Sequence, residues 1–247
     1  MATASNIEWT EQTWNPVTGC TKISPGCKHC YAETMARRLR AMGGAGYERG
    51  FELTLQPSRI SQPLERKKPT VWFVNSMSDL FHEDVPDEYI DRVFDTIRRT
   101  PHHTYQVLTK RAERLPSYFA GRSAPENVWL GVSVENRRHG KPRVAYLRSI
   151  SAHIRFLSVE PLLEDLGALD LNGIHWVIVG GESGSKARPM RPEWARSIQR
   201  QCEKAGVAYF FKQWGAWGAD GRKRTKHANG REFDGQIWDQ YPAAFTA

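Results

Sequence analysis

The chain has 247 residues, of which 40% are hydrophobic and 25% are charged, and this composition excludes intrinsically disordered and fibrous proteins. The formal net charge of +8 favours a polyanionic partner such as a nucleic acid, although ordinary solvated surfaces explain it equally well. No apolar run approaches the ~20 residues that span a bilayer, and the first twenty residues lack signal-peptide features, so we expect a cytoplasmic protein without membrane contact.

Short apolar runs alternate with helical patterns along most of the chain. In chain order, the predicted strands are Thr13–Val17, Phe51–Leu55, Val71–Val74, Tyr105–Leu108, Val128–Val134, Ile154–Val159, Trp176–Val179 and Tyr209–Lys212. The predicted helices are Tyr31–Met42, Asp87–Arg99, Arg111–Phe119, Pro142–Ile150 and Pro192–Ala205. In the second helix, apolar residues recur with a period of 3.6, which is typical of an amphipathic helix.

Helices between successive strands imply crossover connections and therefore a parallel sheet. Eight candidate strands predict an α/β fold with a complete or nearly complete (β/α)8 TIM-type barrel over residues 1–214. A doubly wound open sheet is the alternative. Residues 215–247 are rich in glycine and basic residues, and we expect them to form a small hairpin extension packed on the barrel.

Three of the four cysteines, Cys20, Cys27 and Cys30, lie within eleven residues in the pattern C-x6-C-x2-C. Clustered cysteines in such a chain bind metal more often than they form disulfides. Three thiolates can hold three irons of a [4Fe–4S] cluster and leave the fourth iron open to a substrate or cosubstrate. The alternative is a zinc site completed by His29 or a distant residue. Cys202, inside a predicted helix, is expected to be a buried structural thiol.

A three-cysteine loop after the first strand of an α/β barrel resembles the radical S-adenosylmethionine (SAM) superfamily. Its usual spacing is C-x3-C-x2-C with an aromatic residue between the last two cysteines; here the first gap is longer and His29 takes the aromatic's place. The blocks WNPVTGC, SPGCKHCYA, SDLFH, LTKR, SVEP and GGESG, within residues 14–184, resemble an uncharacterised, often phage-encoded three-cysteine-motif family. Several blocks are also similar to the spore-photoproduct-lyase branch of the superfamily.

In a barrel of this kind, chemistry belongs at the carboxyl ends of the strands. By resemblance, the residues expected to bind SAM are Asn75, Ser76, Ser78, Asp79, Thr109, Lys110, Ser133 and Glu135. Ser78 or Asp79 would also serve as a helix cap. The candidate catalytic residues on the substrate side are Glu160, Glu182 and Lys212. We expect His82, His102 and His103 to be surface or supporting residues rather than ligands.

The resemblance implies an enzyme that cleaves SAM reductively at a [4Fe–4S] cluster to methionine and a 5′-deoxyadenosyl radical, with electrons from an external donor. The basic charge favours a nucleic-acid base as the substrate, for modification or lesion repair. One alternative is a non-catalytic nucleic-acid-binding protein with a structural zinc or iron–sulfur site. Another is a protein-modifying radical enzyme that works with a separately encoded protein partner.

Overall fold

The computed structural model describes residues 3–5 and 7–243, and the chain divides into two compact units. Unit 1 comprises residues 1–23, 30–131 and 150–153, and unit 2 comprises residues 24–29, 132–149 and 154–247. The division passes through the cysteine loop, so Cys20 and Cys30 belong to unit 1 and Cys27 belongs to unit 2.

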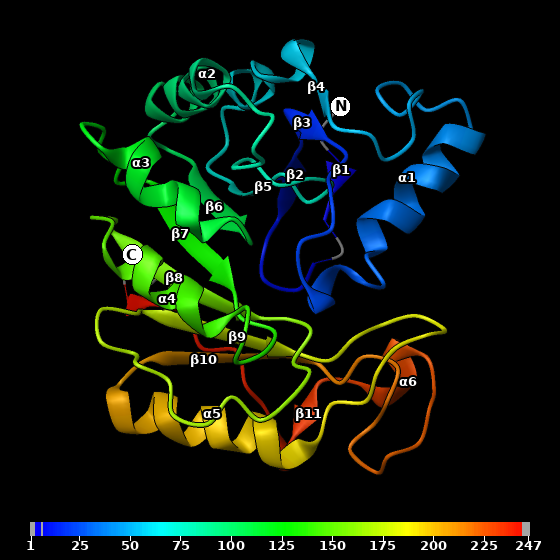
Figure 1. The fold of residues 1–247 in the computed structure, drawn as a ribbon. Coiled ribbons are helices and arrows are strands. Elements are labelled where there is room, and N and C mark those ends of the chain that lie inside the picture. Colours follow the sequence, from blue (N-terminus) through cyan, green and yellow to red (C-terminus); the bar gives the residue numbers. More distant parts are fainter. Residues whose placement is uncertain (1–2, 6, 244–247) are drawn as a thin grey trace. The chain divides into compact units, whose positions relative to one another are not determined.

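Unit 1 consists of short strands and three α-helices (Figure 1). Its strands are β1 (Thr3–Ala4), β2 (Gln12–Trp14), β3 (Val17–Thr18), β4 (Thr54–Leu55), β5 (Val71–Val74) and β6 (Thr104–Thr109). Its helices are α1 (Tyr31–Ala41), α2 (Asp87–Arg98) and α3 (Leu115–Phe119), with 3-10 turns η2 (Pro57–Arg59), η3 (Gln62–Glu65) and η4 (Ala112–Arg114). Strand β7 (Val128–Ser133) begins in unit 1 and ends in unit 2.

Unit 2 carries the later strands and the C-terminal hairpin. Its strands are β8 (Ile154–Val159), β9 (Trp176–Gly180), β10 (Ala208–Gln213), β11 (Glu232–Phe233) and β12 (Gln236–Ile237). Its helices are α4 (Lys141–Arg148), α5 (Pro192–Ala205) and α6 (Lys226–Asn229), and a 3-10 turn, η1 (Pro25–Cys27), carries the middle cysteine. In Figure 1, α5 runs alongside β10, the strand that follows it in the chain.

The main sheet is parallel and its strands follow one another in chain order. The order is β2-β5-β6-β7 in unit 1 and β7-β8-β9-β10 in unit 2, with β1 antiparallel to β2 at the edge. The pairs β2–β5 and β5–β6, and the pairs β8–β9 and β9–β10, are parallel. Because a doubly wound sheet reverses its strand order at a switch point, this sequential order also argues against the alternative topology.

The α/β class and the parallel sheet are confirmed, and of the predicted complete or nearly complete (β/α)8 barrel the complete, eight-stranded form is wrong. The sheet is open, with seven strands from β2 to β10. The segment Phe51–Leu55, counted as a barrel strand, forms only the two-residue β4, which pairs antiparallel with β3. Both residues of β4 are partly exposed, so this segment lacks the burial on both faces that a strand inside a parallel sheet has.

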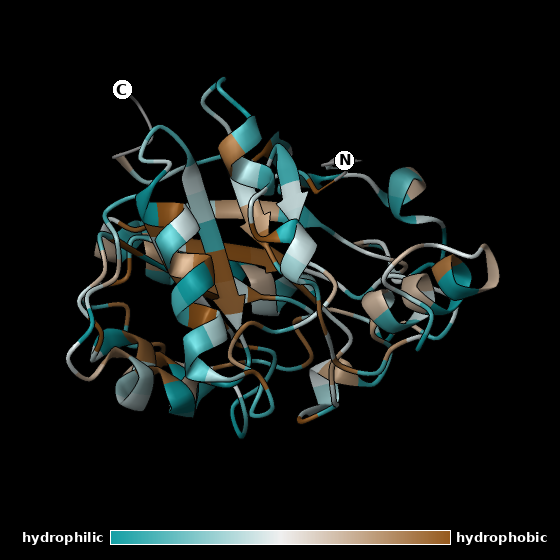
Figure 2. Cartoon of the chain, turned by 90° about the horizontal axis from the view of Figure 1, so that it is seen from above, coloured by the Kyte–Doolittle hydropathy of each residue, from teal (hydrophilic) through white to brown (hydrophobic). Residues whose placement is uncertain are grey.

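Buried apolar residues gather on the strands of each unit, and strands near the middle of Figure 2 are brown. In unit 1, Ile90, Val93, Phe94 and Ile97 of α2 are all buried, as the 3.6-residue period predicts. The indole nitrogen of Trp14 on β2, a fully buried residue, donates to the carbonyl of Arg59 over 2.7 Å. No helix among the described residues is long and apolar enough to cross a membrane.

In unit 2, the predicted C-terminal hairpin is present as β11–β12. Asp234 and Gly235 form its two-residue loop with φ angles of 50° and 81°, the positive values that a tight hairpin turn requires. Phe233, which is 1% exposed, stacks on Phe211 of β10 with ring centroids 4.9 Å apart. The extension over residues 215–243 therefore contributes a buried side chain to the core of unit 2. The predicted division of the chain into a barrel over residues 1–214 and an extension over residues 215–247 stays a prediction.

Candidate functional site

Cys20 lies in a turn that two segments of unit 1 hold in place. Gly19, directly before it, has a φ of 78°, and a Cβ there would lie 2.1 Å from the carbonyl oxygen of Glu52, so only glycine fits. The amide of Gly19 donates to the carbonyl of Met77 over 3.0 Å, and the amide of Cys20 donates to that of Phe51 over 3.1 Å. These contacts fix the backbone that carries the first thiol.

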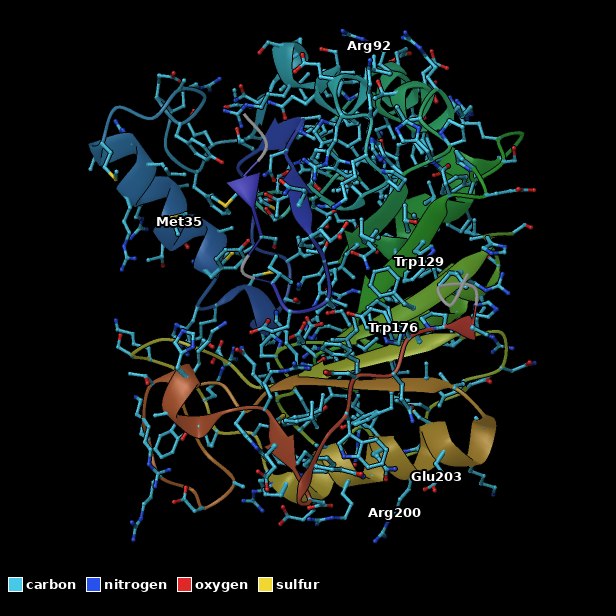
Figure 3. The ribbon with its side chains drawn as sticks, turned by 180° about the vertical axis from the view of Figure 1, so that it is seen from behind. Met35, Arg92, Trp129, Trp176, Arg200 and Glu203 are labelled. Carbon is cyan, nitrogen blue, oxygen red and sulfur yellow. The ribbon has the colours of Figure 1, made fainter. Side chains whose placement is uncertain are left out.

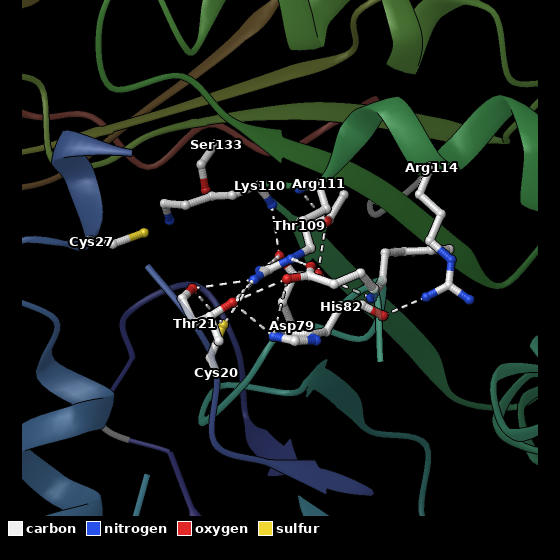
Figure 4. Close-up of polar contacts among 12 residues, drawn as sticks. Cys20, Thr21, Cys27, Asp79, His82, Thr109, Lys110, Arg111, Arg114 and Ser133 are labelled. Atoms are coloured by element: carbon white, nitrogen blue, oxygen red, sulfur yellow. Dashed lines mark hydrogen bonds and ion pairs between the residues drawn. The ribbon is translucent and has the colours of Figure 1, made fainter. Parts of the chain in front are cut away.

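Arg111, which follows β6, lies against the Cys20 thiol and is almost fully buried (Figure 4). Its Nη1 donates to Cys20 Sγ over 3.4 Å and lies 3.5 Å from Asp79 Oδ2. Its Nη2 donates to Thr21 Oγ1 over 2.6 Å, and its Nε donates to Glu83 Oε2 over 2.6 Å. A guanidinium that donates to sulfur favours the thiolate form, which is the form that binds metal.

Both carboxylate oxygens of Asp79 accept hydrogen bonds within unit 1. Its Oδ1 accepts from the hydroxyl of Thr109 over 2.8 Å and from the amide of Phe81 over 3.0 Å, and its Oδ2 accepts from the amide of Lys110 over 2.9 Å. Burial lowers the pKa of Arg111, but the charge of Asp79, the hydrogen bond to Glu83 and the contact with Cys20 together outweigh burial and raise the pKa. The predicted residues Asp79, Thr109 and Lys110 therefore do come together, and their described contacts orient Arg111.

Glu83 and His82 complete the surroundings of Thr21. Partial burial raises the pKa of Glu83, but the hydrogen bond and the charge of Arg111, together with a backbone hydrogen bond, outweigh burial and bring the pKa to about 2. His82 is fully buried, so it is a supporting residue and not a surface one. Its Nδ1 accepts from the amide of Asp84 over 3.1 Å, which leaves Nε2 to donate to Thr21 Oγ1 over 2.9 Å. Burial lowers the pKa of His82, so the ring is neutral at pH 7.

The remaining predicted SAM residues of unit 1 hold the chain around the end of β5. Asn75 Oδ1 accepts from the amide of Val17 over 3.2 Å, and Ser78 Oγ donates to the carbonyl of Val17 over 2.8 Å. Ser76 Oγ donates to Asn15 Oδ1 over 3.2 Å. Asn75 is 3% exposed, and its Nδ2 has no hydrogen-bond partner among the described residues. This amide is therefore a buried donor that a bound molecule would satisfy.

In unit 2, an arginine fastens the turn that carries Cys27. Arg188 donates from Nη2 to the carbonyl of Pro25, in η1, over 3.0 Å. The same residue pairs with the buried Glu182 through its amide, its Nε and its Nη2, at 2.8, 2.9 and 2.6 Å. Burial raises the pKa of Glu182, but the hydrogen bonds from Arg188 outweigh it and lower the pKa. Glu182, predicted as a catalytic residue, is thus the partner that orients Arg188.

Glu135 lies against the same turn. Its carboxylate is fully buried and pairs with Arg143 Nη1 at 2.6 Å, and the same Nη1 donates to the carbonyl of Ser133 over 2.9 Å. A Cβ added at Gly26 would lie 3.1–3.2 Å from the Glu135 side chain, so a glycine allows the turn to approach this carboxylate. The predicted pair Ser133 and Glu135 is therefore joined through Arg143, next to the turn that carries Cys27.

The other two predicted catalytic residues form an ion pair in unit 2. Lys212 Nζ lies 3.2 Å from Glu160 Oε1, and both side chains are mostly buried. A Cβ at Gly180 would lie 2.5 Å from Glu160 Oε1, so the glycine at the end of β9 makes room for the carboxylate. A partly buried acid next to an ammonium group is suited to proton transfer or to binding a polar substrate, and the catalytic roles of Glu160, Glu182 and Lys212 stay predictions.

All four cysteines are free thiols, and the three in the loop are partly exposed. Cys202 is buried, and burial raises its pKa to about 12, as expected of an inert structural thiol. Among residues 3–5 and 7–243, no group of three or more His, Cys, Asp or Glu side chains is gathered in a way that would hold a metal ion. The assignment of Cys20, Cys27 and Cys30 to a cluster therefore stays a prediction.

The sequence analysis did not identify the arginines that, within each unit, contact the cysteine loop or the carboxylates beside it. Arg188 follows Glu182 by six residues and Arg143 follows Glu135 by eight, and in neither pair do the two residues share a helix or strand whose period would reveal the contact. Arg111 entered the sequence analysis as the first residue of a predicted helix. The acidic residues predicted at the strand ends were the signal that could have pointed to these arginines, because a buried carboxylate requires a positively charged or hydrogen-bonding partner.

The model of a family described as "Protein of unknown function (DUF5131)" matches residues 4–242. No curated protein matches the chain. A cysteine-to-serine mutant of spore photoproduct lyase is similar with a TM-score of 0.51 at 16% identity, covering 83% of this chain and 64% of that chain. A cysteine-to-alanine mutant of the same enzyme is similar with a TM-score of 0.51 at 13% identity, covering 86% of this chain and 78% of that chain. A mutant with bound AdoMet and dinucleoside spore photoproduct has a TM-score of 0.49 at 15% identity, covering 83% of this chain and 64% of that chain.

These likenesses show a shared fold. They agree with the sequence resemblance to the spore-photoproduct-lyase branch, whereas the phage-encoded family stays a prediction. The chain spans 64% of the length of two of these three structures.

Proposed function

From the premise that this chain belongs to the DUF5131 family, we propose that it is a radical SAM enzyme that acts on a nucleic-acid base. The observation that carries the proposal is the contact of the Arg111 guanidinium with Cys20 Sγ at 3.4 Å, at the start of a loop with three free thiols. Arg111 is paired with Asp79 and Glu83, and its contact with Cys20 places a positive charge beside the sulfur, which stabilises a thiolate. The fold shared with spore photoproduct lyase supports the same class of chemistry.

The three cysteines of the loop supply the type of ligand that the iron–sulfur cluster of this class implies, although the described residues do not gather three such side chains into a metal site. Cys20, Cys27 and Cys30 are free thiols on one loop, and thiolates are the usual ligands of such clusters. Three thiolates leave one iron for SAM, and the buried, unpartnered Nδ2 of Asn75 is a donor suited to a polar group of SAM. When bound, the cluster supplies the electron that cleaves SAM reductively.

The chain's own residues would hold these groups and shield them. Arg111 keeps positive charge beside Cys20, and the frame of Asp79, Thr109 and Glu83 fixes its orientation. In unit 2, Arg188 fixes the Pro25 carbonyl and with it the turn of Cys27. Arg111 is almost fully buried, which strengthens its electrostatic contacts.

The nucleic-acid part of the proposal rests on charge and on likeness. The formal net charge of +8 favours association with phosphate-rich molecules. The solved structures of the same fold belong to an enzyme named for a photoproduct, and one of them holds a dinucleoside photoproduct. On the substrate side, the Glu160–Lys212 pair offers both an acceptor and a donor for the polar edge of a base.

The test of the cluster chemistry is anaerobic reconstitution with iron and sulfide, followed by SAM and dithionite. We expect a brown protein that produces 5′-deoxyadenosine. Cys27→Ala should lose both colour and product, whereas the matched control Cys202→Ala should keep both, because Cys202 lies outside the loop. A protein that binds only zinc, tightly and stoichiometrically, would overturn the proposal.

The substrate class needs a separate experiment. Single- and double-stranded oligonucleotides, intact or ultraviolet-irradiated, are incubated with the reconstituted enzyme, and their masses are compared before and after. We expect a mass change or lesion reversal that depends on SAM and on Cys27. Product 5′-deoxyadenosine without any change in a nucleic acid, together with a modified protein recovered from the same assay, would assign the substrate to the protein class instead.

A further inference from the structure

Two loops of unit 2 concentrate positive charge. They follow β9 and β10, span residues 183–191 and 216–227, and are together named the basic loop pair. Their basic residues are Lys186, Arg188, Arg191, Arg222, Lys223, Arg224 and Lys226, and Asp220 is their one acidic residue. Because both loops follow the carboxyl ends of parallel strands, they lie at the edge where such sheets bind ligands.

Contacts between the two loops hold them together (Figure 1). Trp217 Nε1 donates to the carbonyl of Ala187 over 2.7 Å, and Trp217 pairs with Lys223 in an antiparallel bridge. Lys223 Nζ donates to the carbonyl of Ser185 and lies 5.5 Å from the centre of the Trp217 ring. The indole thus joins the loops, and the basic loop pair is a preformed surface rather than two independent segments.

The one carboxylate of this surface is already neutralised. Arg224 donates to both of its oxygens, from Nη1 to Asp220 Oδ1 over 2.9 Å and from Nη2 to Oδ2 over 2.6 Å, and these hydrogen bonds hold the pKa of Asp220 far below its usual range. Lys186 and Lys223 form no ion pair with any described residue. The Arg222 side chain is 79% exposed and lies 3.9 Å from Asp220. The surface therefore presents uncompensated positive charge.

Neutral donors accompany this charge. Residues 183–186 are all exposed, and their backbone amides donate to no described residue. Ser183 Oγ accepts from Gln213 Nε2 over 3.0 Å, which leaves its hydroxyl hydrogen to donate elsewhere. Lysine and arginine side chains, serine hydroxyls and backbone amides are the groups that contact phosphate oxygens in nucleic-acid complexes.

The same surface is poorly suited to a protein partner. Protein interfaces centre on apolar and aromatic side chains that enter the partner. None of the exposed large hydrophobic side chains among the described residues lies in the basic loop pair. Trp217 is only partly exposed, and its indole is engaged with Ala187 and Lys223. Charge without an apolar centre favours a phosphate backbone over an acidic protein.

We propose that the basic loop pair binds the sugar–phosphate backbone of a nucleic acid, with Lys186, Arg222 and Lys223 as the charged contacts. The inference rests on the proposed function and deepens it. Gln213, which reaches Ser183, directly follows Lys212, so the loops adjoin the strand end that carries the Glu160–Lys212 pair. That pair would meet a base, and the loops would hold the strand. Because every nucleotide carries the same phosphate, this contact is independent of base sequence.

The test measures the anisotropy of labelled duplex oligonucleotides of two unrelated sequences with the full chain, without cluster or SAM. Lys186→Glu/Arg222→Glu should weaken binding about 10-fold for both sequences. It should also reduce the slope of log affinity against log salt by about 2, because fewer counterions are released. Lys186→Gln/Arg222→Gln should lose less affinity. The matched control, Arg200→Glu/Lys204→Glu on α5, makes the same change in charge, and Arg200 lies at the surface in Figure 3. It should keep the slope.

The outcomes separate the surface from the chemistry. Unchanged affinity and slope in Lys186→Glu/Arg222→Glu overturn the inference, and so does an equal loss in the α5 control. Displacement of the oligonucleotide by polyglutamate at equal charge concentration assigns the surface to acidic polypeptides and also overturns it. Unfolding midpoints should match the unmodified chain, because both side chains are exposed. A chain that binds through the loops but makes no 5′-deoxyadenosine after reconstitution keeps this inference and loses the radical chemistry. A chain that makes 5′-deoxyadenosine but binds no oligonucleotide does the reverse.

Discussion

Arg188 donates to the carbonyl of Pro25 across 163 residues of sequence, at 3.0 Å, while Glu182 holds its guanidinium from the other side. The contact links the end of β9 to the turn that presents Cys27. In unit 1, Arg111 makes the corresponding contact with Cys20 and Thr21. Each unit thus uses one arginine, oriented by carboxylates, to fix its part of the cysteine loop.

Replacing Arg188 by Ala should loosen the turn of Cys27. Without its partner, the buried Glu182 carboxylate is left uncompensated, and we expect a loss of about 2 kcal/mol in the free energy of unfolding. Iron content after reconstitution should fall as well. Chemical denaturation and iron analysis measure the two effects. The control, Arg196→Ala, removes an exposed pair with Asp234 in the same unit and should leave the iron content unchanged. Full iron content in Arg188→Ala would contradict the positioning role.

Glu83 should make the stability of the protein depend on pH in acid. Its pKa falls from 4.5 to about 2 in the folded chain, where it faces Arg111 and His82. A lowered folded-state pKa stabilises the fold above pH 4.5, and this contribution disappears as the pH falls from 4.5 toward 2. Because Glu83 is more than half exposed, the effect should be only about 0.5 kcal/mol. Denaturant midpoints measured at several pH values between 4.5 and 2 should depend less on pH for Glu83→Gln than for the unmodified chain. An unchanged pH dependence would count against the Glu83–Arg111 ion pair.

Gly180→Ala should disturb the Glu160–Lys212 ion pair. The new Cβ would lie 2.5 Å from Glu160 Oε1, so the carboxylate must move away from Lys212. We expect a loss of about 1 kcal/mol in the free energy of unfolding, as for other broken, partly buried pairs. A double-mutant cycle with Glu160→Ala measures the coupling, because the alanine at 180 should cost little once the carboxylate is gone. Strictly additive losses would show that the cost comes from the backbone instead.

The C-terminal hairpin should contribute to the stability of unit 2. Phe233→Ala removes a buried ring that stacks on Phe211, and we expect a loss of about 3 kcal/mol. Gly235→Ala places a side chain at a φ of 81° and should cost about 1 kcal/mol. Thermal or chemical unfolding measures both, with the exposed Ile237→Ala as the control. If Phe233→Ala unfolds like Ile237→Ala, the hairpin adds nothing to the core.

The amino-acid sequence by itself determined the α/β class, the parallel sheet and most of the helices and strands. These features follow from local patterns: the 3.6-residue period of α2, the apolar runs of β5 to β10, and the glycine-rich composition that favoured a C-terminal hairpin. The sequence also showed the three clustered cysteines and the polar residues that follow each strand. These polar residues were expected to lie together because the carboxyl ends of parallel strands meet at one edge of the sheet.

Only the tertiary structure decided which of these polar residues are free to act. Asp79, Glu135 and Glu182 were each predicted to touch a cofactor or a substrate, and each is engaged with an arginine in the fold. A buried carboxylate needs a counter-charge, but the sequence does not say which arginine supplies it, since the partner is set by packing and not by spacing. The missing eighth strand has the same origin: Phe51–Leu55 has the composition of a strand, and only its pairing with β3 and its exposure show that it lies outside the main sheet.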